Sequence, residues 1–189
     1  MPMRDLCIIL PMKRIKIITG GIGSGKSYVC EKLRKRGIEV YDCDAAAKRI
    51  MRDNADVRRK LIDLIGEEAY AGKELNKAAV AKFLLLSDDN TRAINAIVHP
   101  AVAADFISSG YEWMESAIYY EADFGKVLNE VSGGELVPYV ICVSAQTKVR
   151  IRRIMKRDNI TEEKALEWIN KQIQQEEKER RSDFVIYNT

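Results

Sequence analysis

Residues 20–27 have the types and spacing that phosphate chemistry needs. They read Gly-Gly-Ile-Gly-Ser-Gly-Lys-Ser, the pattern G-x-x-x-x-G-K-S, between a β-branched run and a helical pattern. Glycines such as Gly21 and Gly23 let the backbone N–H groups point toward a phosphate, Lys26 can reach the β- and γ-phosphates, and the Ser27 hydroxyl can bind Mg²⁺. A glycine turn that binds nothing would leave a lysine unexplained at the start of a helix, where the helix dipole disfavours a cation. The sequence therefore predicts a nucleoside triphosphate site.

Two carboxylates, Asp42 and Asp44, follow the apolar run at 38–41. If the chain stays extended there, strand alternation places both on one face. This edge of an α/β sheet borders the phosphate loop, so one carboxylate can accept a proton from an incoming hydroxyl while the other orients Mg²⁺ or the substrate. Asp44 is the candidate general base and Asp42 a candidate substrate ligand. The alternative is that one of them caps the helix expected from Ala45.

A run of basic residues at 148–157 contains no acidic residue. Arginines that close over a transferring phosphoryl group neutralise its charge and exclude water. Arg153 and Arg157 lie four positions apart and share one helix face. We therefore predict a basic lid at about 148–162. The alternatives are an RNA-binding stripe, for which no interleaved aromatic residue is available to stack on bases, and an ordinary solvated face.

His99 is the only histidine of the chain and precedes Pro100, where we expect one helix to end and another to begin. Histidine can act as a general base. A cap or a packing contact at that junction is the alternative.

These residues need strands and helices to position them. Strands rich in β-branched or aromatic residues are expected at 15–19, 38–41, 117–120, 139–144 and 184–187. Their nearly continuous apolar character, with helical patterns between them, predicts an α/β fold whose parallel sheet is covered on both faces. The nucleotide would then bind at the carboxyl ends of the strands.

Residues 45–116 show no strand pattern and predict consecutive helices, with Asn76 and Ser87 as N-caps. We interpret them as a helical insertion that binds the substrate above the nucleotide site. The core then comprises residues 12–44 and 117–189. The alternative is a set of additional packing helices.

Length and composition fit one soluble domain. The chain has 189 residues, 47% hydrophobic and 31% charged, with a net charge of +3. No apolar run approaches the roughly 20 residues that span a bilayer, so no membrane segment is expected. Basic residues alternate with acidic ones over most of the chain, so nucleic acid is not the expected partner. Residues 1–11 are interpreted as a disordered N-terminal extension, with Met12 as an alternative start.

The four cysteines lie far apart in the sequence, without a C-x-x-C pair. With one histidine in the chain, they do not predict a zinc site. Cys30 and Cys142 fall in apolar patterns and are expected to be buried thiols, which suits the cytoplasm.

Taken in order, these motifs resemble the dephospho-CoA kinase family from residue 15 to residue 188. The matching segments are 19–27, Asp42-Cys-Asp44, His99-Pro100, Arg153 with Arg157-Asp158, Gln172 and 182–188. The resemblance implies a three-layer P-loop kinase fold with a five-stranded parallel sheet. It also implies ATP-dependent phosphorylation of the ribose 3′-hydroxyl of dephospho-CoA, giving CoA and ADP, with Mg²⁺ as the metal. We expect a cytoplasmic monomer.

The resemblance also implies roles for single residues. Asp44 matches the family's base, Arg153 and Arg157 match lid arginines, Asn188 lies near the adenine, and His99 falls in the acceptor-binding region. The implied ATP-binding residues are Gly21, Gly23, Ser24, Gly25, Lys26, Ser27, Tyr28 and Asn188.

Three positions depart from the family pattern. Tyr28 stands where threonine is usual, Tyr187 where aspartate is usual, and residues 116–121 differ from the common Pro-Leu-Leu-x-Glu. Ser27 is intact, so Mg²⁺ binding should survive, whereas the change at Tyr187 predicts reduced ATP affinity.

Two other interpretations compete with this one. Shikimate kinase also combines a phosphate loop, an Asp-x-Asp segment and an arginine lid. The long insertion and the lack of an Arg-Gly-Gly segment after the third expected strand argue against it. A GTPase switch would use the D-x-x-G pattern at 63–66, but this lies in a helical pattern and no N-K-x-D motif accompanies it.

Overall fold

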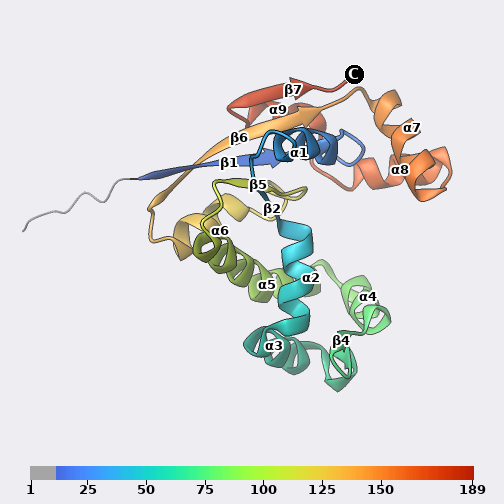
Figure 1. Cartoon of the computed structure of the whole chain (residues 1–189). Helices are drawn as coiled ribbons and strands as arrows, with labels where there is room; N and C mark the ends of the chain where they lie inside the picture. The colour runs from blue at the N-terminus through green and yellow to red at the C-terminus, as the bar shows by residue number, and fades with distance from the viewer. Residues whose placement is uncertain (1–11) are drawn as a thin grey trace, which may run out of the picture.

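The computed structural model describes residues 12–189, so the prediction of a disordered extension at residues 1–11 lies outside the described residues. Five strands form one parallel sheet in the order β2-β5-β1-β6-β7 (Figure 1). These strands are β1 (Lys13–Thr19), β2 (Val40–Asp42), β5 (Trp113–Glu115), β6 (Leu136–Ser144) and β7 (Phe184–Tyr187). The predicted α/β class and five-stranded parallel sheet are confirmed.

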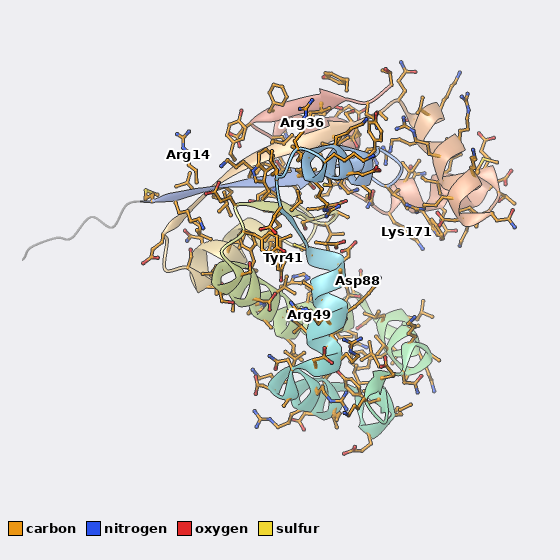
Figure 2. The ribbon with its side chains drawn as sticks, viewed as in Figure 1. Arg14, Arg36, Tyr41, Arg49, Asp88 and Lys171 are labelled. Carbon is orange, nitrogen blue, oxygen red and sulfur yellow. The ribbon has the colours of Figure 1, made fainter. Side chains whose placement is uncertain are left out.

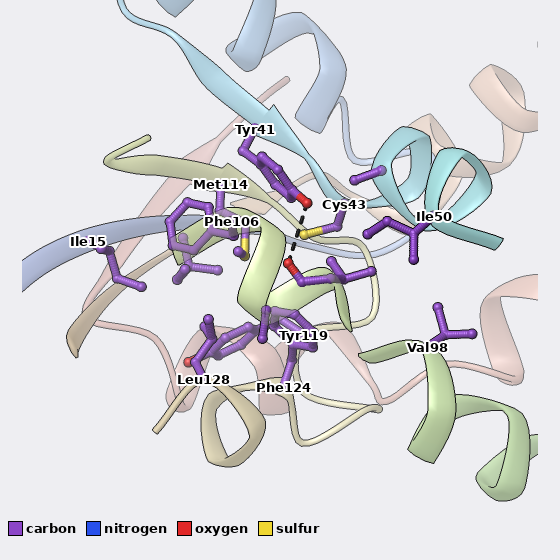
Figure 3. Packing of buried hydrophobic residues seen from close by; sticks show 14 of the residues in the cluster. Ile15, Tyr41, Cys43, Ile50, Val98, Phe106, Met114, Tyr119, Phe124 and Leu128 are labelled. Carbon is purple, nitrogen blue, oxygen red and sulfur yellow. Dashed lines mark hydrogen bonds between the residues drawn. The ribbon is translucent and has the colours of Figure 1, made fainter. Parts of the chain in front are cut away.

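Helices cover both faces of this sheet. The α-helices of residues 12–189 are α1 (Lys26–Arg34), α2 (Cys43–Asp53), α3 (Ala55–Ile65), α4 (Lys77–Leu86), α5 (Asp88–Ser109), α6 (Phe124–Val131), α7 (Thr147–Asp158), α8 (Glu162–Asn170) and α9 (Gln175–Arg180). On one face, α1 packs Cys30 against Ile18 of β1. On the other, α5 and α6 pack against Ile15 and Ile17 of the same strand (Figures 1 and 3). Because β1 is buried on both faces, all three isoleucines are fully covered.

The third strand lies earlier than predicted. We expected it at 117–120, but residues 117–123 form turns and the strand is β5. The error came from Tyr119 and Tyr120, whose aromatic character is typical of a strand but which are buried in the turn instead. β5 is three residues long, with only Met114 fully buried, so it gives almost no periodic signal.

The expectation that residues 45–116 hold no strand is therefore wrong as well. β5 belongs to the central sheet, so the helical insertion ends before Trp113. Within the insertion, a 3₁₀ turn at Glu67–Ala69 leads into a two-stranded antiparallel hairpin, β3 (Tyr70–Ala71) and β4 (Glu74–Leu75).

The insertion is otherwise helical, from α2 to α5. Asn76 and Ser87 accept N-cap hydrogen bonds from Ala79 and Asn90, as predicted. The predicted break at His99-Pro100 is wrong, because α5 runs through Pro100. The buried side chains of α5 flank the proline on both sides and hold the helix against the core, which outweighs the one lost backbone hydrogen bond.

A polar contact also fixes α2 against α5. Tyr41 Oη donates a hydrogen bond to Asp105 Oδ2 at 2.6 Å, and Arg49 Nη2 lies 2.6 Å from the same oxygen. Figure 2 shows Tyr41 beside the start of α2 and Arg49 farther along that helix. The Asp105 carboxylate of α5 therefore links α5 to both β2 and α2.

The predicted lid forms a small helical unit after β6. Ile151 and Ile154 of α7 pack against Ala165 and Ile169 of α8, and Thr161 caps α8 as expected. Among residues 12–189, none of the helices has the length and apolar character needed to cross a membrane.

Candidate active site

The phosphate loop connects β1 to α1, which begins at Lys26. Gly23 and Gly25 have positive φ angles of 78° and 96°, which residues with a Cβ rarely adopt. A side chain at Gly25 would also collide with the Asn188 amide. The strand, loop and helix therefore occur in the order that the motif requires.

Lys26 is the first residue of α1, and its side chain reaches back to the start of the loop. Its Nζ donates to the carbonyl oxygens of Gly20 at 2.9 Å and Gly21 at 3.4 Å. Burial lowers the pKa of Lys26; the charges of Glu115 and Asp44 oppose that shift, while Lys178 and Arg150 add to it. Two carboxylates and two further cations therefore act on the ammonium, so the site concentrates charge of both signs around the loop.

Ser27 faces a carboxylate that we did not predict. Its Oγ donates to Glu115 Oε1 at 3.3 Å. Glu115 is the last residue of β5, whose neighbour in the sheet is β1, so its side chain emerges at the same edge as the loop. A hydroxyl next to a carboxylate is a donor set that suits Mg²⁺, which prefers oxygen and takes further ligands from phosphates. Glu115 was missed because the strand was expected at 117–120.

The two predicted carboxylates have different roles in the structure. Asp42 caps α2, because its Oδ1 accepts the backbone N–H of Ala45 at 2.9 Å. Asp44 lies in the first helical turn, so the two do not share a strand face as expected. The chain turns helical at Cys43, one residue before the carboxylate that the alternation argument needed.

Asp44 and His99 lie together at a cavity of about 190 Å³. Apolar side chains of α2 and α5, including Met51 and Val98, form much of its lining. The imidazole of His99 also packs edge-on against the Phe124 ring, 5.7 Å away, and burial lowers the His99 pKa, which favours the neutral form. The structure therefore brings the predicted base and the predicted acceptor residue to one cavity.

The two predicted lid arginines of α7 have different contacts. Arg153 Nη1 donates to the carbonyl oxygens of Gly23 at 3.4 Å and Ser24 at 3.2 Å. Arg157, by contrast, pairs with its neighbour Asp158 at 2.7 Å and is 60% exposed. Of the two predicted lid arginines, the structure brings only Arg153 to the loop.

Besides Arg153, a second arginine of α7 contacts the loop, and it was not predicted as a site residue. Arg150 is buried, and its Nε donates to the carbonyl oxygen of Ile22 at 2.9 Å. Its position three residues before Arg153 puts both on the face of α7 that meets the loop. That spacing was the available signal.

Two glutamines also reach the loop. Gln172 Oε1 accepts the N–H of Ile22 at 2.7 Å, and Gln175 Oε1 accepts the N–H of Gly21 at 3.1 Å. Gln172 belongs to the motif series quoted above, whereas Gln175 gave no signal in the sequence.

Asn188 touches the loop as well. Its Nδ2 donates to the Ser24 carbonyl at 2.8 Å. Tyr28 and Tyr187 are exposed, at 55% and 69%. The ring of Tyr28 carries the ammonium of Lys32 above it, 5.1 Å from its centroid.

A buried ion pair lies behind the loop. Lys178 of α9 is fully buried, and its Nζ lies 2.5 Å from Glu121 Oε1 in the turn after β5. Burial of an isolated ammonium would cost far more than this paired arrangement, so the two residues fix α9 and the turn together.

Cys30, Cys43 and Cys142 are buried free thiols, and Cys7 lies outside the described residues. Across residues 12–189, no group of three or more His, Cys, Asp or Glu side chains is placed to hold a metal.

Comparisons with known proteins give a consistent result. The family model described as dephospho-CoA kinase matches residues 15–189. A dephospho-CoA kinase of Bacteroides fragilis (strain YCH46) is 38% identical over 182 residues, covering 92% of this chain and 84% of that protein. One of Salinibacter ruber is 32% identical over 172 residues, covering 90% and 86%.

Solved structures agree on the fold. TT1252 from Thermus thermophilus superposes with a TM-score of 0.75 at 29% identity, covering 94% of this chain and 90% of that one. A dephospho-CoA kinase from Campylobacter jejuni gives a TM-score of 0.61 at 20% identity, covering 93% and 89%, which supports the fold alone.

Proposed function

The chain belongs to the dephospho-CoA kinase family, and from this we propose how its residues carry out the kinase reaction, with Asp44 as the general base. The enzyme phosphorylates dephospho-CoA in the biosynthesis of CoA. The shikimate kinase and GTPase alternatives lose their support, because the family model and the curated relatives are dephospho-CoA kinases.

The chemical step transfers the γ-phosphoryl group of ATP to the ribose 3′-hydroxyl. A bond forms between the ribose 3′-oxygen and the γ-phosphorus of ATP, and the bond from that phosphorus to the β–γ bridging oxygen breaks, which leaves ADP. Asp44 accepts the proton that the hydroxyl loses. Positioning and charge stabilisation supply most of the remaining catalysis in such transfers.

The observation that carries this proposal is the position of Asp44. It lines the cavity that also contains His99, and its charge acts on Lys26. The carboxylate therefore lines a cavity suited to an acceptor and influences the charge of the lysine suited to the donor's phosphates. Asp42 is occupied as a helix cap, so its role in substrate binding stays a prediction.

The phosphates would be held by the loop. The backbone N–H groups of residues 23–27 and the ammonium of Lys26 bind phosphate oxygens. Arg153 is anchored on the loop carbonyls and can turn its remaining N–H groups toward the same charge. Arg157 is exposed on α7 and would reach the site when the lid closes.

Ser27 and Glu115 are the residues that would hold Mg²⁺. Their oxygens fit its preference for hard ligands, and they lie 3.3 Å apart beside the loop. When bound, Mg²⁺ neutralises negative charge that develops on the phosphate oxygens. Asn188 and Tyr28 flank the loop at the positions expected to contact the nucleotide.

The acceptor would bind between α2 and α5 of the insertion. His99 and the apolar side chains of the cavity then contact dephospho-CoA. This arrangement supports the interpretation of the helical insertion as an acceptor-binding lobe, while the contacts of Arg153 with the loop support residues around 148–162 as a lid.

The proposal extends to the oligomeric state of the enzyme and to its location in the cell. We propose that the enzyme is a monomer, which light scattering of the purified protein would test. The three described cysteines are free thiols, which suits the reducing cytoplasm.

Replacing Asp44 by Asn tests the base directly. We expect kcat with dephospho-CoA to fall by about 10²–10⁴-fold, because a general base acts in the transition state. ATP affinity, measured by calorimetry, should stay within twofold or so of wild type, since Asp44 is assigned to the acceptor side. Normal turnover of Asp44→Asn would overturn the assignment.

A further inference from the structure

We propose that Gln172 and Gln175 are positioning residues that hold the ammonium of Lys26 in place by fixing two peptide groups of the phosphate loop. This inference rests on the proposed function, in which Lys26 binds the phosphates of ATP. The two glutamines reach the loop from the other end of the chain, 150 and 154 residues away from the residues they bond.

Both glutamines accept hydrogen bonds from backbone N–H groups of the loop. Gln175 takes the N–H of Gly21 at 3.1 Å, and Gln172 takes the N–H of Ile22 at 2.7 Å. These two N–H groups belong to consecutive peptide groups, the first between Gly20 and Gly21 and the second between Gly21 and Ile22.

The opposite ends of the same peptide groups bind Lys26. A trans peptide is planar, and its N–H and C=O point in opposite directions. Every peptide bond in the described chain is trans. The Gly20 carbonyl accepts Lys26 Nζ at 2.9 Å and the Gly21 carbonyl accepts it at 3.4 Å. Each glutamine therefore lies at one edge of a peptide group, and the lysine ammonium lies at the opposite edge.

Both peptide groups adjoin Gly21, and the first also adjoins Gly20, so they rotate easily unless hydrogen bonds hold them. The Gly21 carbonyl also accepts the Ser24 N–H at 3.1 Å, so the first group depends more on its glutamine than the second. Gly20 has φ of 144°, and glycine residues rotate between conformations at little steric cost. If a glutamine is lost, its N–H partner is left buried and unpaired, which favours rotation of the peptide. Rotation would turn the carbonyl away from Lys26 and release the ammonium from its acceptor.

The Gln175 side chain is itself held in place. Gln175 is buried and its Nε2 donates to Cys142 Sγ at 3.2 Å. A Cβ at Gly21 would lie 2.8 Å from Gln175 Oε1 and would also collide with Arg150. Gln175 and Arg150 therefore contact the backbone at Gly21 directly, and no side chain fits at that position.

A different role would be purely structural. Gln172 follows α8 and Gln175 is the first residue of α9, and their hydrogen bonds could serve only to attach this segment to the core. In that case their loss would lower the stability of the protein without a specific effect on the lysine. The two roles are separated by measuring whether each glutamine acts through Lys26.

The experiment is a set of double-mutant cycles on the full chain. Gln172→Met and Gln175→Met keep the side-chain length and remove the amide, each alone and combined with Lys26→Met. The exposed Gln174, in the same segment, gives the matched control Gln174→Met. ATP affinity by calorimetry, kcat and KM for ATP, and thermal stability are measured for every variant.

We expect Gln172→Met and Gln175→Met each to weaken ATP binding and to raise KM for ATP about three- to tenfold, the effect of one lost hydrogen bond. In the Lys26→Met background the same changes should have almost no further effect, because the group they position is gone. Gln174→Met should match wild type.

Two results would overturn the inference. One is a set of losses that simply multiply in the Lys26→Met background. The other is a drop in thermal stability with unchanged ATP affinity and KM. If Lys26→Met itself left ATP binding and kcat unchanged, the proposed function of the lysine would be wrong, which is a separate failure.

Discussion

Ser27 and Glu115 lie 88 positions apart in the sequence, yet the Ser27 hydroxyl donates a 3.3 Å hydrogen bond to the Glu115 carboxylate. The parallel pairing of β1 with β5 creates this contact, because it aligns the end of β5 with the start of the loop. The same carboxylate is the largest opposing influence on the lowered pKa of Lys26. Glu115 thus acts on both Lys26 and Ser27 of the phosphate motif.

Glu115→Gln should weaken the use of Mg²⁺. The substitution keeps the shape of the side chain and removes its charge, so the Mg²⁺ concentration for half-maximal activity should rise about tenfold or more. Titrating activity against Mg²⁺ measures this. Glu112→Gln is the control, because Glu112 is 59% exposed and pairs with Lys16 at the other end of the strand. Equal Mg²⁺ dependence in both variants would exclude Glu115 from the metal site.

Asp42→Ala should destabilise the protein through α2. The loss of an N-cap hydrogen bond costs about 1 kcal/mol, whereas Asp42→Asn keeps a side-chain oxygen for the cap and should be close to neutral. Urea unfolding of both variants checks this. We expect KM for dephospho-CoA to be unchanged in Asp42→Asn; a raised KM there would instead establish the substrate-binding role predicted from the sequence.

The contrast between Asp42 and Asp44 shows what local sequence can and cannot predict. The loop, four of the five strands and the N-caps at Asn76 and Ser87 follow from short-range patterns, and the structure places them as expected. The point at which a strand becomes a helix is less well specified, and a shift of two residues separated the roles of the two aspartates.

The other errors of the sequence-based prediction arose from tertiary packing. Tyr119 and Tyr120 have strand character but bury their rings from a turn, and α5 continues through Pro100 because both flanks are packed against the core. The contacts of Gln172 and Gln175 depend on chain segments about 150 residues apart meeting in space, which local periodicity does not encode.

Arg157→Ala should impair catalysis without affecting stability. The side chain is 60% exposed and pairs only with adjacent Asp158 in the described structure, so its removal leaves no buried partner. If it neutralises the transferring phosphoryl group, kcat falls about 100-fold. Steady-state kinetics and thermal unfolding measure the two effects, with exposed Arg152→Ala as the control. Intact kcat would leave Arg157 as an ordinary surface residue.

Cys30 should make the stability of the protein sensitive to alkaline pH. The side chain is fully buried between α1 and the sheet, and burial, followed by the charge of Glu115, raises the pKa of the thiol from 9.0 to about 12. In the unfolded chain the thiol ionises near its ordinary value. Between pH 9 and 12 the unfolded state therefore holds fewer protons than the folded state, and the free energy of unfolding falls as pH rises.

Cys30→Ala should make this alkaline loss shallower. At pH 7 the thiol is protonated in both states, so the difference between the variant and wild type reports only packing; above pH 9 that difference should shrink as wild type loses stability faster. Burial also raises the pKa of Cys43 and Cys142, so the variant keeps part of the slope, while the lowered pKa of Lys26 acts in the opposite direction in both proteins. Urea unfolding at pH 7, 8, 9 and 10 measures the two slopes, and parallel curves would show that Cys30 does not couple to folding.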